Sequence, residues 1–153
     1  MSRVLSRTVL VAVLLMAGLW PFAHHVLVER WEANPWKFAG WAMYTEPVPP
    51  VLVALFEPRD GGFVYLQELS LAPVVLAELD RFKARRRELG RLVSPDDLAR
   101  VALGARQDLF SVSVLVQRFR LDPKTAMITT TRQRYDYLRS SDGGVVSIGS
   151  AAL

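Results

Sequence analysis

Only two histidines occur in the chain, His24 and His25, and they are adjacent. An imidazole can bind a metal or a haem iron or carry protons, and ionisable groups are costly at membrane depth. Successive residues of a helix point about 100° apart, however, so adjacent histidines do not naturally converge on one ion. The alternative is that both are neutral and hydrogen-bonded near the outer face of a membrane. We therefore expect no metal and no cofactor.

Four arginines are candidates for binding an anion. They come from two stretches predicted as strands, 111–121 and 126–138, which the turn at 122–125 joins into a hairpin. Because strand residues two apart share a face, we predict a cationic strip made of Arg118, Arg120, Arg132 and Arg134. Such a strip would bind anionic lipid or another anionic ligand. The alternative is that these arginines are simply solvated on an antiparallel sheet.

Asp96 and Asp97 are the nearest approach to a catalytic carboxylate pair. They follow Ser94 and Pro95, an order typical of a helix N-terminus, where acidic groups favour the positive end of the helix dipole. No nucleotide, hydrolase or metalloprotease motif occurs, and the absence of cysteine excludes a thiol nucleophile and a disulfide framework. A net charge of +4 is too small to indicate nucleic acid. We expect a protein that is not an enzyme. The alternative is an enzyme with an unrecognised carboxylate site.

Residues 8–28 hold both histidines and no charged residue. As a helix they would span roughly 31 Å, about the thickness of a bilayer core, so we predict a transmembrane helix in which Pro21 causes a kink. Arg3 and Arg7 in residues 1–7 favour a cytoplasmic N-terminus and a domain on the outer face. The alternatives are a cleaved signal peptide, for which no good cleavage site is present, and the inverted topology.

The segment 29–50 is rich in aromatic residues and ends in a proline-rich spacer, Glu46 to Pro50. Aromatic side chains favour the headgroup region of a bilayer, so one interpretation is an interfacial collar that seats the domain on the lipid. The other is a docking surface for a multi-pass membrane protein, because small residues allow close approach of helices. The candidate interface residues are Trp31, Trp36, Phe38, Gly40, Trp41, Met43 and Tyr44.

Residues 34–44, NPWKFAGWAMY, resemble the W-x-M-[YF] segment that follows a transmembrane helix in bacterial HTTM proteins, which are similar to vitamin K-dependent carboxylase. The resemblance covers about a dozen residues. Those proteins are multi-pass, whereas this chain has one predicted span, so the resemblance implies a bacterial inner-membrane setting and not carboxylase chemistry.

Residues 51–139 predict a small α+β domain with an antiparallel sheet and the order ββααββ. Two strands flank the turn at 57–62, and two helices follow. The first helix, from Pro73 to about Gly90, has an apolar stripe and a basic outward side that includes Arg86. The segment 140–153 is rich in small residues, and we predict a flexible tail.

Together these features favour a single-pass, non-enzymatic accessory protein of a bacterial inner-membrane complex, with a signal-anchor helix and a periplasmic domain that binds a membrane-embedded partner. The alternatives are an anionic lipid or ligand-handling domain and an enzyme.

Overall fold

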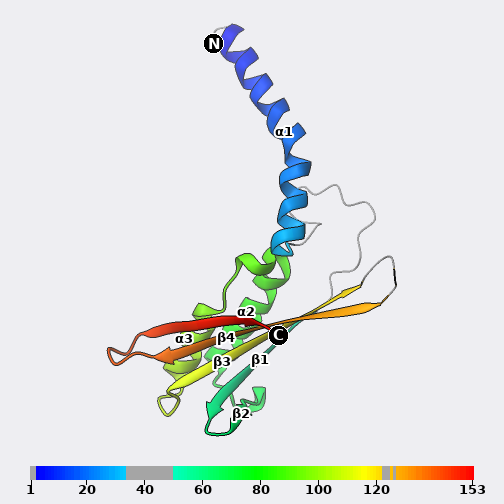
Figure 1. Ribbon diagram of the computed structural model, residues 1–153. Helices are drawn as coiled ribbons and strands as arrows, with labels where there is room; N and C mark the ends of the chain where they lie inside the picture. The colour runs from blue at the N-terminus through cyan, green and yellow to red at the C-terminus, as the bar shows by residue number, and fades with distance from the viewer. Residues whose placement is uncertain (1–2, 34–49, 122–124, 126) are drawn as a thin grey trace.

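The computed structural model describes residues 3–33, 50–121, 125 and 127–153. Figure 1 shows one long helix that projects away from a small domain of sheet and helices. Along the chain the elements are α1 (Arg3–Trp31), β1 (Val51–Arg59), β2 (Gly62–Tyr65), the 3₁₀ turn η1 (Glu68–Ser70), α2 (Pro73–Leu89), the 3₁₀ turn η2 (Gly90–Leu92), α3 (Asp96–Ala105), β3 (Ser111–Leu121), β4 (Ile128–Arg139) and β5 (Val145–Ala152).

Helix α1 is long and apolar enough over Arg7–Trp31 to cross a membrane. Its large apolar side chains, such as Leu14 and Met16, are exposed rather than packed on the domain. Pro21 lies inside the helix, and α1 changes direction along its length (Figure 1). The sequence prediction of an apolar N-terminal helix is therefore confirmed.

The domain is a five-stranded antiparallel sheet in the order β2-β1-β3-β4-β5. Helices α2 and α3 cover one face of this sheet. Because successive side chains of a strand point to opposite faces, every second residue faces the helices. On that face Val53 pairs with Val116 and Leu55 with Val114, and all four side chains are buried. The α+β class and the ββααββ order predicted from the sequence are confirmed, with one further strand at the end.

The buried stripe of α2 explains how this helix packs. Val75, Leu79 and Phe82 follow the helical period and are at most 2% exposed, so each contributes about 1.5–3 kcal/mol of burial free energy. Arg86 continues the same stripe four residues later and is also buried, at 1% exposure. The prediction that Arg86 points outward is wrong, because the helical period outweighs the polarity of the side chain.

The prediction of a flexible tail over residues 140–153 is also wrong, since Val145–Ala152 form β5. A turn at Ser140–Gly144 reverses the chain, with Gly143 at φ 82° and its N–H donating to the carbonyl of Ser140. The strand then pairs with β4 along its length. Small side chains did not predict a strand, but the free edge of β4 supplies the backbone partners that order one.

Candidate functional site

The candidate functional site is the junction between α1 and the sheet domain. At the end of α1 the backbone of Glu32 turns left-handed, with φ 56°. This conformation is unfavourable for a residue with a side chain, and it is held only where the surroundings compensate for it. The N–H of Ala33, which is 3% exposed, donates to the carbonyl of Leu27 and closes the end of the helix.

Two arginines of the domain bind the carboxylate of Glu32. Arg91 of η2 lies 2.7 Å from its Oε1, and Arg118 of β3 lies 2.8 Å from its Oε2. Arg118 Nη1 also donates to the main-chain oxygen of Glu32 at 2.8 Å. The Arg118 side chain is only 13% exposed, so its bonds to Glu32 are shielded from water and are stronger than an ordinary surface ion pair.

Gly90 allows the two parts of the chain to come this close. It begins η2 with φ 59° and ψ −135°, which a residue with a Cβ rarely adopts. A Cβ at Gly90 would overlap the main-chain carbonyls of Trp31 and Glu32. The end of α1 therefore packs directly on bare backbone of the domain.

Arg86 supports the junction from beneath. Its Nη1 donates to the carbonyl of Val93 at 2.6 Å, and its Nη2 donates to the hydroxyl of Tyr135 at 3.2 Å and to the side-chain oxygen of Gln133. Burial lowers the pKa of Arg86 from its ordinary value, while Tyr135 and the nearby carboxylate of Glu32 oppose that shift. Arg86 thus joins α2 to β4 and to Val93, the residue that follows η2, and it helps to fix the surface on which α1 ends.

The predicted arginine strip is not assembled in one place. Arg118 pairs with Thr131 on the face that the helices cover, whereas Arg132 and Arg134 pair with Gln117 and Leu115 on the other face. Arg132 donates to the side-chain oxygen of Gln117 at 3.2 Å, and Arg134 donates to Asp136 at 3.1 Å. Arg120 belongs to β3, and its side chain lies outside what the structure describes. The three described arginines therefore serve two different faces.

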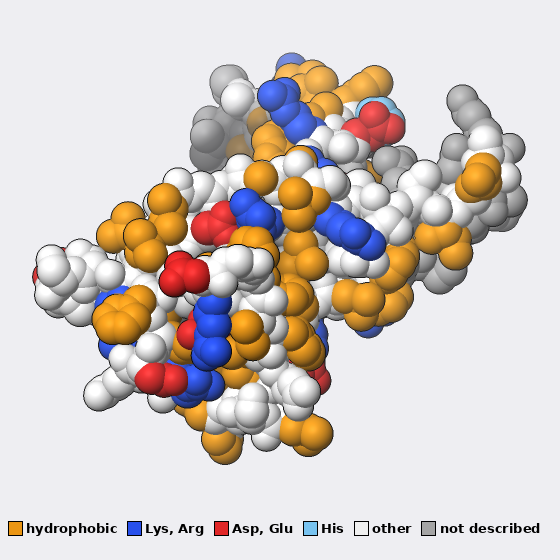
Figure 2. All heavy atoms as spheres, turned by 60° about the horizontal axis from the view of Figure 1, so that its bottom comes forward, with side chains coloured by type: hydrophobic (Ala, Val, Ile, Leu, Met, Phe, Trp, Pro, Cys, Tyr) orange, Lys and Arg blue, Asp and Glu red, His pale blue; other side chains and the backbone are white. Residues whose placement is uncertain are grey.

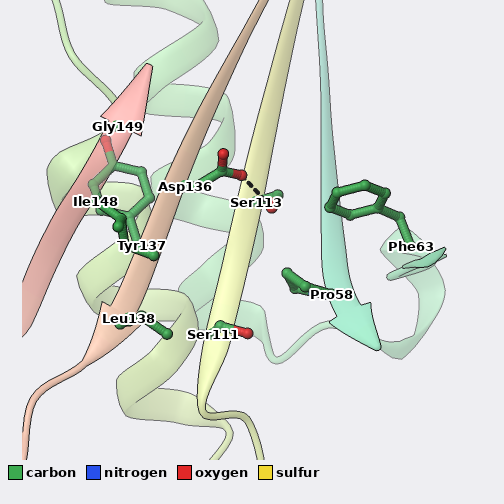
Figure 3. A pocket seen from close by; sticks show the side chains of 9 residues that line it. All are labelled: Pro58, Phe63, Ser111, Ser113, Asp136, Tyr137, Leu138, Ile148 and Gly149. Atoms are coloured by element: carbon green, nitrogen blue, oxygen red, sulfur yellow. Dashed lines mark hydrogen bonds between the residues drawn. The ribbon is translucent and has the colours of Figure 1, made fainter. Parts of the chain in front are cut away.

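The uncovered face of the sheet carries a shallow hollow of about 310 Å³. Figure 3 shows Ser113 and Asp136 directed toward each other at its centre, with Phe63 on the β2 side and Ile148 on the β5 side. Ser113 is 1% exposed and donates to Asp136 at 2.6 Å, and the guanidinium of Arg134 lies 5.3 Å from the ring of Phe63. These contacts satisfy the two polar side chains at the centre of the hollow, Ser113 and Asp136, within the sheet itself.

The carboxylate and histidine candidates predicted from the sequence are held in structural contacts. The hydroxyl of Tyr137 donates to Asp96 at 2.7 Å, and burial, reinforced by this bond, raises the pKa of Tyr137 well above its ordinary value. His24 is 8% exposed and its ring lies 6.2 Å from that of Trp20. His25 is exposed, 3.9 Å from Glu29. Among the described residues no group of three or more His, Asp or Glu could hold a metal ion.

Most of the predicted aromatic interface lies outside the described residues, namely Trp36, Phe38, Gly40, Trp41, Met43 and Tyr44. Trp31 is described, at the end of α1, with the guanidinium of Arg30 5.8 Å from its ring centre. Figure 2 shows the visible face of the molecule, where basic side chains lie beside acidic ones and are separated by hydrophobic ones. That face has no broad surface of a single charge.

Sequence reasoning missed Glu32, Gly90 and Arg86 as members of one site. Arg86 could have been found, because it lies at i+4 from Phe82 on the stripe of α2. For Gly90, the residue type indicates the end of α2 but not the close approach of the end of α1. Glu32 carried no signal, because it meets Arg118 only across 86 residues of chain. Comparison of the chain with protein-family models, curated proteins and solved structures finds no match.

Proposed function

We propose that this protein is a membrane-anchored, non-enzymatic accessory protein whose folded domain is held at a fixed position beside a membrane to bind a multi-pass membrane protein. The observation that carries the proposal is the junction at Glu32, where an apolar helix long enough to span a bilayer is joined to the domain by ion pairs and direct backbone packing. A passive tether would need only a flexible linker. A junction with a strained residue and partly buried ion pairs supports a role in which the position of the domain matters.

The polar groups of the domain support a binding role over a catalytic one. Asp96 is bound by Tyr137, Asp136 by Ser113, and Glu32 by two arginines. Each of these acids is engaged by groups of the fold, and no two of them converge on a shared space with a nucleophile. Their contacts explain their presence as parts of the fold.

The proposed setting is the inner membrane of a bacterium, with the N-terminus in the cytoplasm and the domain in the periplasm. The basic residues at 3 and 7 and the resemblance of residues 34–44 to HTTM proteins support this orientation and setting. Fusion of alkaline phosphatase or of green fluorescent protein to the C-terminal residue tests the orientation. Phosphatase activity without fluorescence is expected, and the reverse result would place the domain in the cytoplasm.

Site-specific photo-crosslinking in intact membranes tests the partner. A photoreactive phenylalanine analogue replaces Trp36 or Trp41 in the full chain, and the adducts are identified by mass spectrometry. We expect an adduct with a multi-pass membrane protein, and we expect Trp36→Ala or Trp41→Ala to lower co-purification of that same protein in mild detergent.

Phe110 provides the matched control, because it is an aromatic side chain that is 77% exposed on the domain. The analogue at Phe110 should give no adduct with the multi-pass protein. Phe110→Ala should leave the co-purification of that protein unchanged. Adducts with lipid alone, or equal recovery of the partner with all three alanine variants, would reject the proposal.

A further inference from the structure

The two edges of the sheet differ in how well they are protected. Strand β2 forms one edge, and it is only four residues long, beside the charged turn at Arg59 and Asp60. Strand β5 forms the other edge, is eight residues long, and contains no charged residue and no proline. Within the described residues β5 has a strand on one side only. Exposed edges are normally blunted by charge, proline or short length, and β5 has none of these features.

The backbone groups available on this edge follow from the bonds on its inner side. The N–H of Ser140 donates to the carbonyl of Gly144, and the N–H of Leu153 donates to the carbonyl of Arg132. In an antiparallel pair, residues directed toward the neighbour alternate with residues directed away from it. This alternation shifts by one residue between the partners of Asp136 and Tyr137, where the pairing is irregular. The N–H and C=O groups that point away from β4 therefore belong to Val145, Ser147, Ser150 and Ala152.

An identical strand is a suitable partner for this edge. When two copies of one strand pair antiparallel about a two-fold axis, the N–H groups of each copy meet the C=O groups of the other. Because β5 is uncharged, no like charges meet in such a pair, whatever its register. Val146 and Ile148, which are 55% and 58% exposed, would lie beside the axis and gain contacts with the second copy.

The position of α1 is compatible with this symmetry. A two-fold axis that continues an antiparallel sheet is perpendicular to the sheet, so both copies keep their helices on the same face. Helix α1 is bound through Arg118, whose side chain lies on the helix-covered face. The two α1 helices would therefore leave the joined sheet on the same side, as two copies in one membrane require.

We propose that β5 is a dimer interface through which two copies of this chain join their sheets into one continuous antiparallel sheet beside the membrane. A strand pair of this length buries less than a standard interface of about 1,200–2,000 Å², so the contact alone is weak. Confinement of both copies in one membrane raises their effective concentration and favours the pair. The proposal does not require the partner described above, and it is tested without it.

A cysteine scan tests the interface, because the natural chain has no cysteine. Single substitutions to Cys at Val146, Ser147, Ile148, Gly149 and Ser150 are made in the full chain, which is reconstituted in lipid and exposed to a mild oxidant. A residue on a two-fold axis meets its own copy within the reach of a disulfide, about 4.4–6.8 Å between Cα atoms. We expect a disulfide-linked dimer at one or two of these positions and much less at the others.

Val64→Cys is the matched control, because Val64 is exposed to a similar degree on the opposite edge strand. It should yield little dimer. Dimer that forms equally at Val64 and at every position of β5, or at none of them, would overturn the proposal. A β5 cysteine that links only to a different protein would also overturn it, since the edge would then serve another partner.

A second pair of variants tests the backbone contact itself. Ser150→Pro removes one outward N–H and leaves the bonds to β4 in place, whereas Ser150→Ala keeps that N–H. In lipid, energy transfer between fluorescent labels on separate copies should be the same in the natural chain and in Ser150→Ala, and it should be lost in Ser150→Pro. Circular dichroism checks that each variant is folded, and the cysteine scan stands independently if Ser150→Pro is not. A natural chain that is monomeric in lipid would refute the dimer.

Discussion

Gly90→Ala should separate the sheet domain from α1 without removing any polar contact directly. Gly90 has φ 59°, and a methyl group there would overlap the carbonyls of Trp31 and Glu32. Neither carbonyl can move away without stretching the bonds that Glu32 makes with Arg91 and Arg118. The substitution therefore acts on the junction as a whole.

The expected magnitude has two parts. An alanine forced into a conformation that favours glycine costs about 1–3 kcal/mol. Loss of hydrogen bonds to charged groups adds about 1.5–3 kcal/mol for each bond broken. Gly61→Ala isolates the first part, because Gly61 has φ 94° and a Cβ added there would have no other atom within 4 Å. We expect Gly90→Ala to lower the free energy of unfolding by about 2–4 kcal/mol more than Gly61→Ala.

Two measurements check this expectation. Thermal unfolding in detergent should show a melting temperature for Gly90→Ala that is roughly 10 °C or more below that of Gly61→Ala. Spin labels at Met16→Cys on α1 and Leu69→Cys on the domain, which are 68% and 99% exposed in the natural chain, report the distance between the two parts. In lipid, we expect a narrow distance distribution when the labelled chain has no further substitution or carries Gly61→Ala, and a broad distribution when it carries Gly90→Ala.

The reasoning would be refuted by equal melting temperatures of the two alanine variants together with unchanged distance distributions. A broad distribution in the natural junction would also refute it, because α1 would then not be held by the contacts at Glu32.

Three further predictions concern single contacts. In a double-mutant cycle by urea unfolding, Glu32→Gln and Arg118→Ala should show a coupling energy of about 2 kcal/mol, and additive effects would mean that the pair contributes nothing to stability. Arg86→Ala should cost about 3–5 kcal/mol because it leaves buried acceptors unpaired and also leaves a cavity. Arg86→Met leaves the same acceptors unpaired but fills most of the space, so it should cost less, and equal losses would contradict the packing role of this side chain. Burial raises the pKa of Tyr137 above its ordinary value of 10.0, so its contribution to stability is complete below pH 10 and is lost as pH rises through the folded pKa. Tyr137→Phe should therefore be less stable than the natural chain at pH 7 and should lose less stability above pH 10, and parallel alkaline curves for the two would argue against the shift.

The sequence by itself determined the elements that depend on local pattern. Apolar residues from 8 to 28 without a charge predict the helix α1, since only length and composition decide whether a segment can span a bilayer. The spacing of Val75, Leu79 and Phe82 predicts α2 and its buried face. Two hairpins around a pair of helices predict the α+β class.

The tertiary structure alone decided which distant groups meet. Arg118 was predicted to share a face with Arg132, but the register opposes Arg132 to Gln117 and sends Arg118 to the other face. A shift of one residue in register exchanges the two faces of a strand, and the composition of the strands does not specify that shift. The contact of Arg118 with Glu32 depends on this register and on the path of the chain over 86 residues, so the junction became visible only once the sheet was assembled.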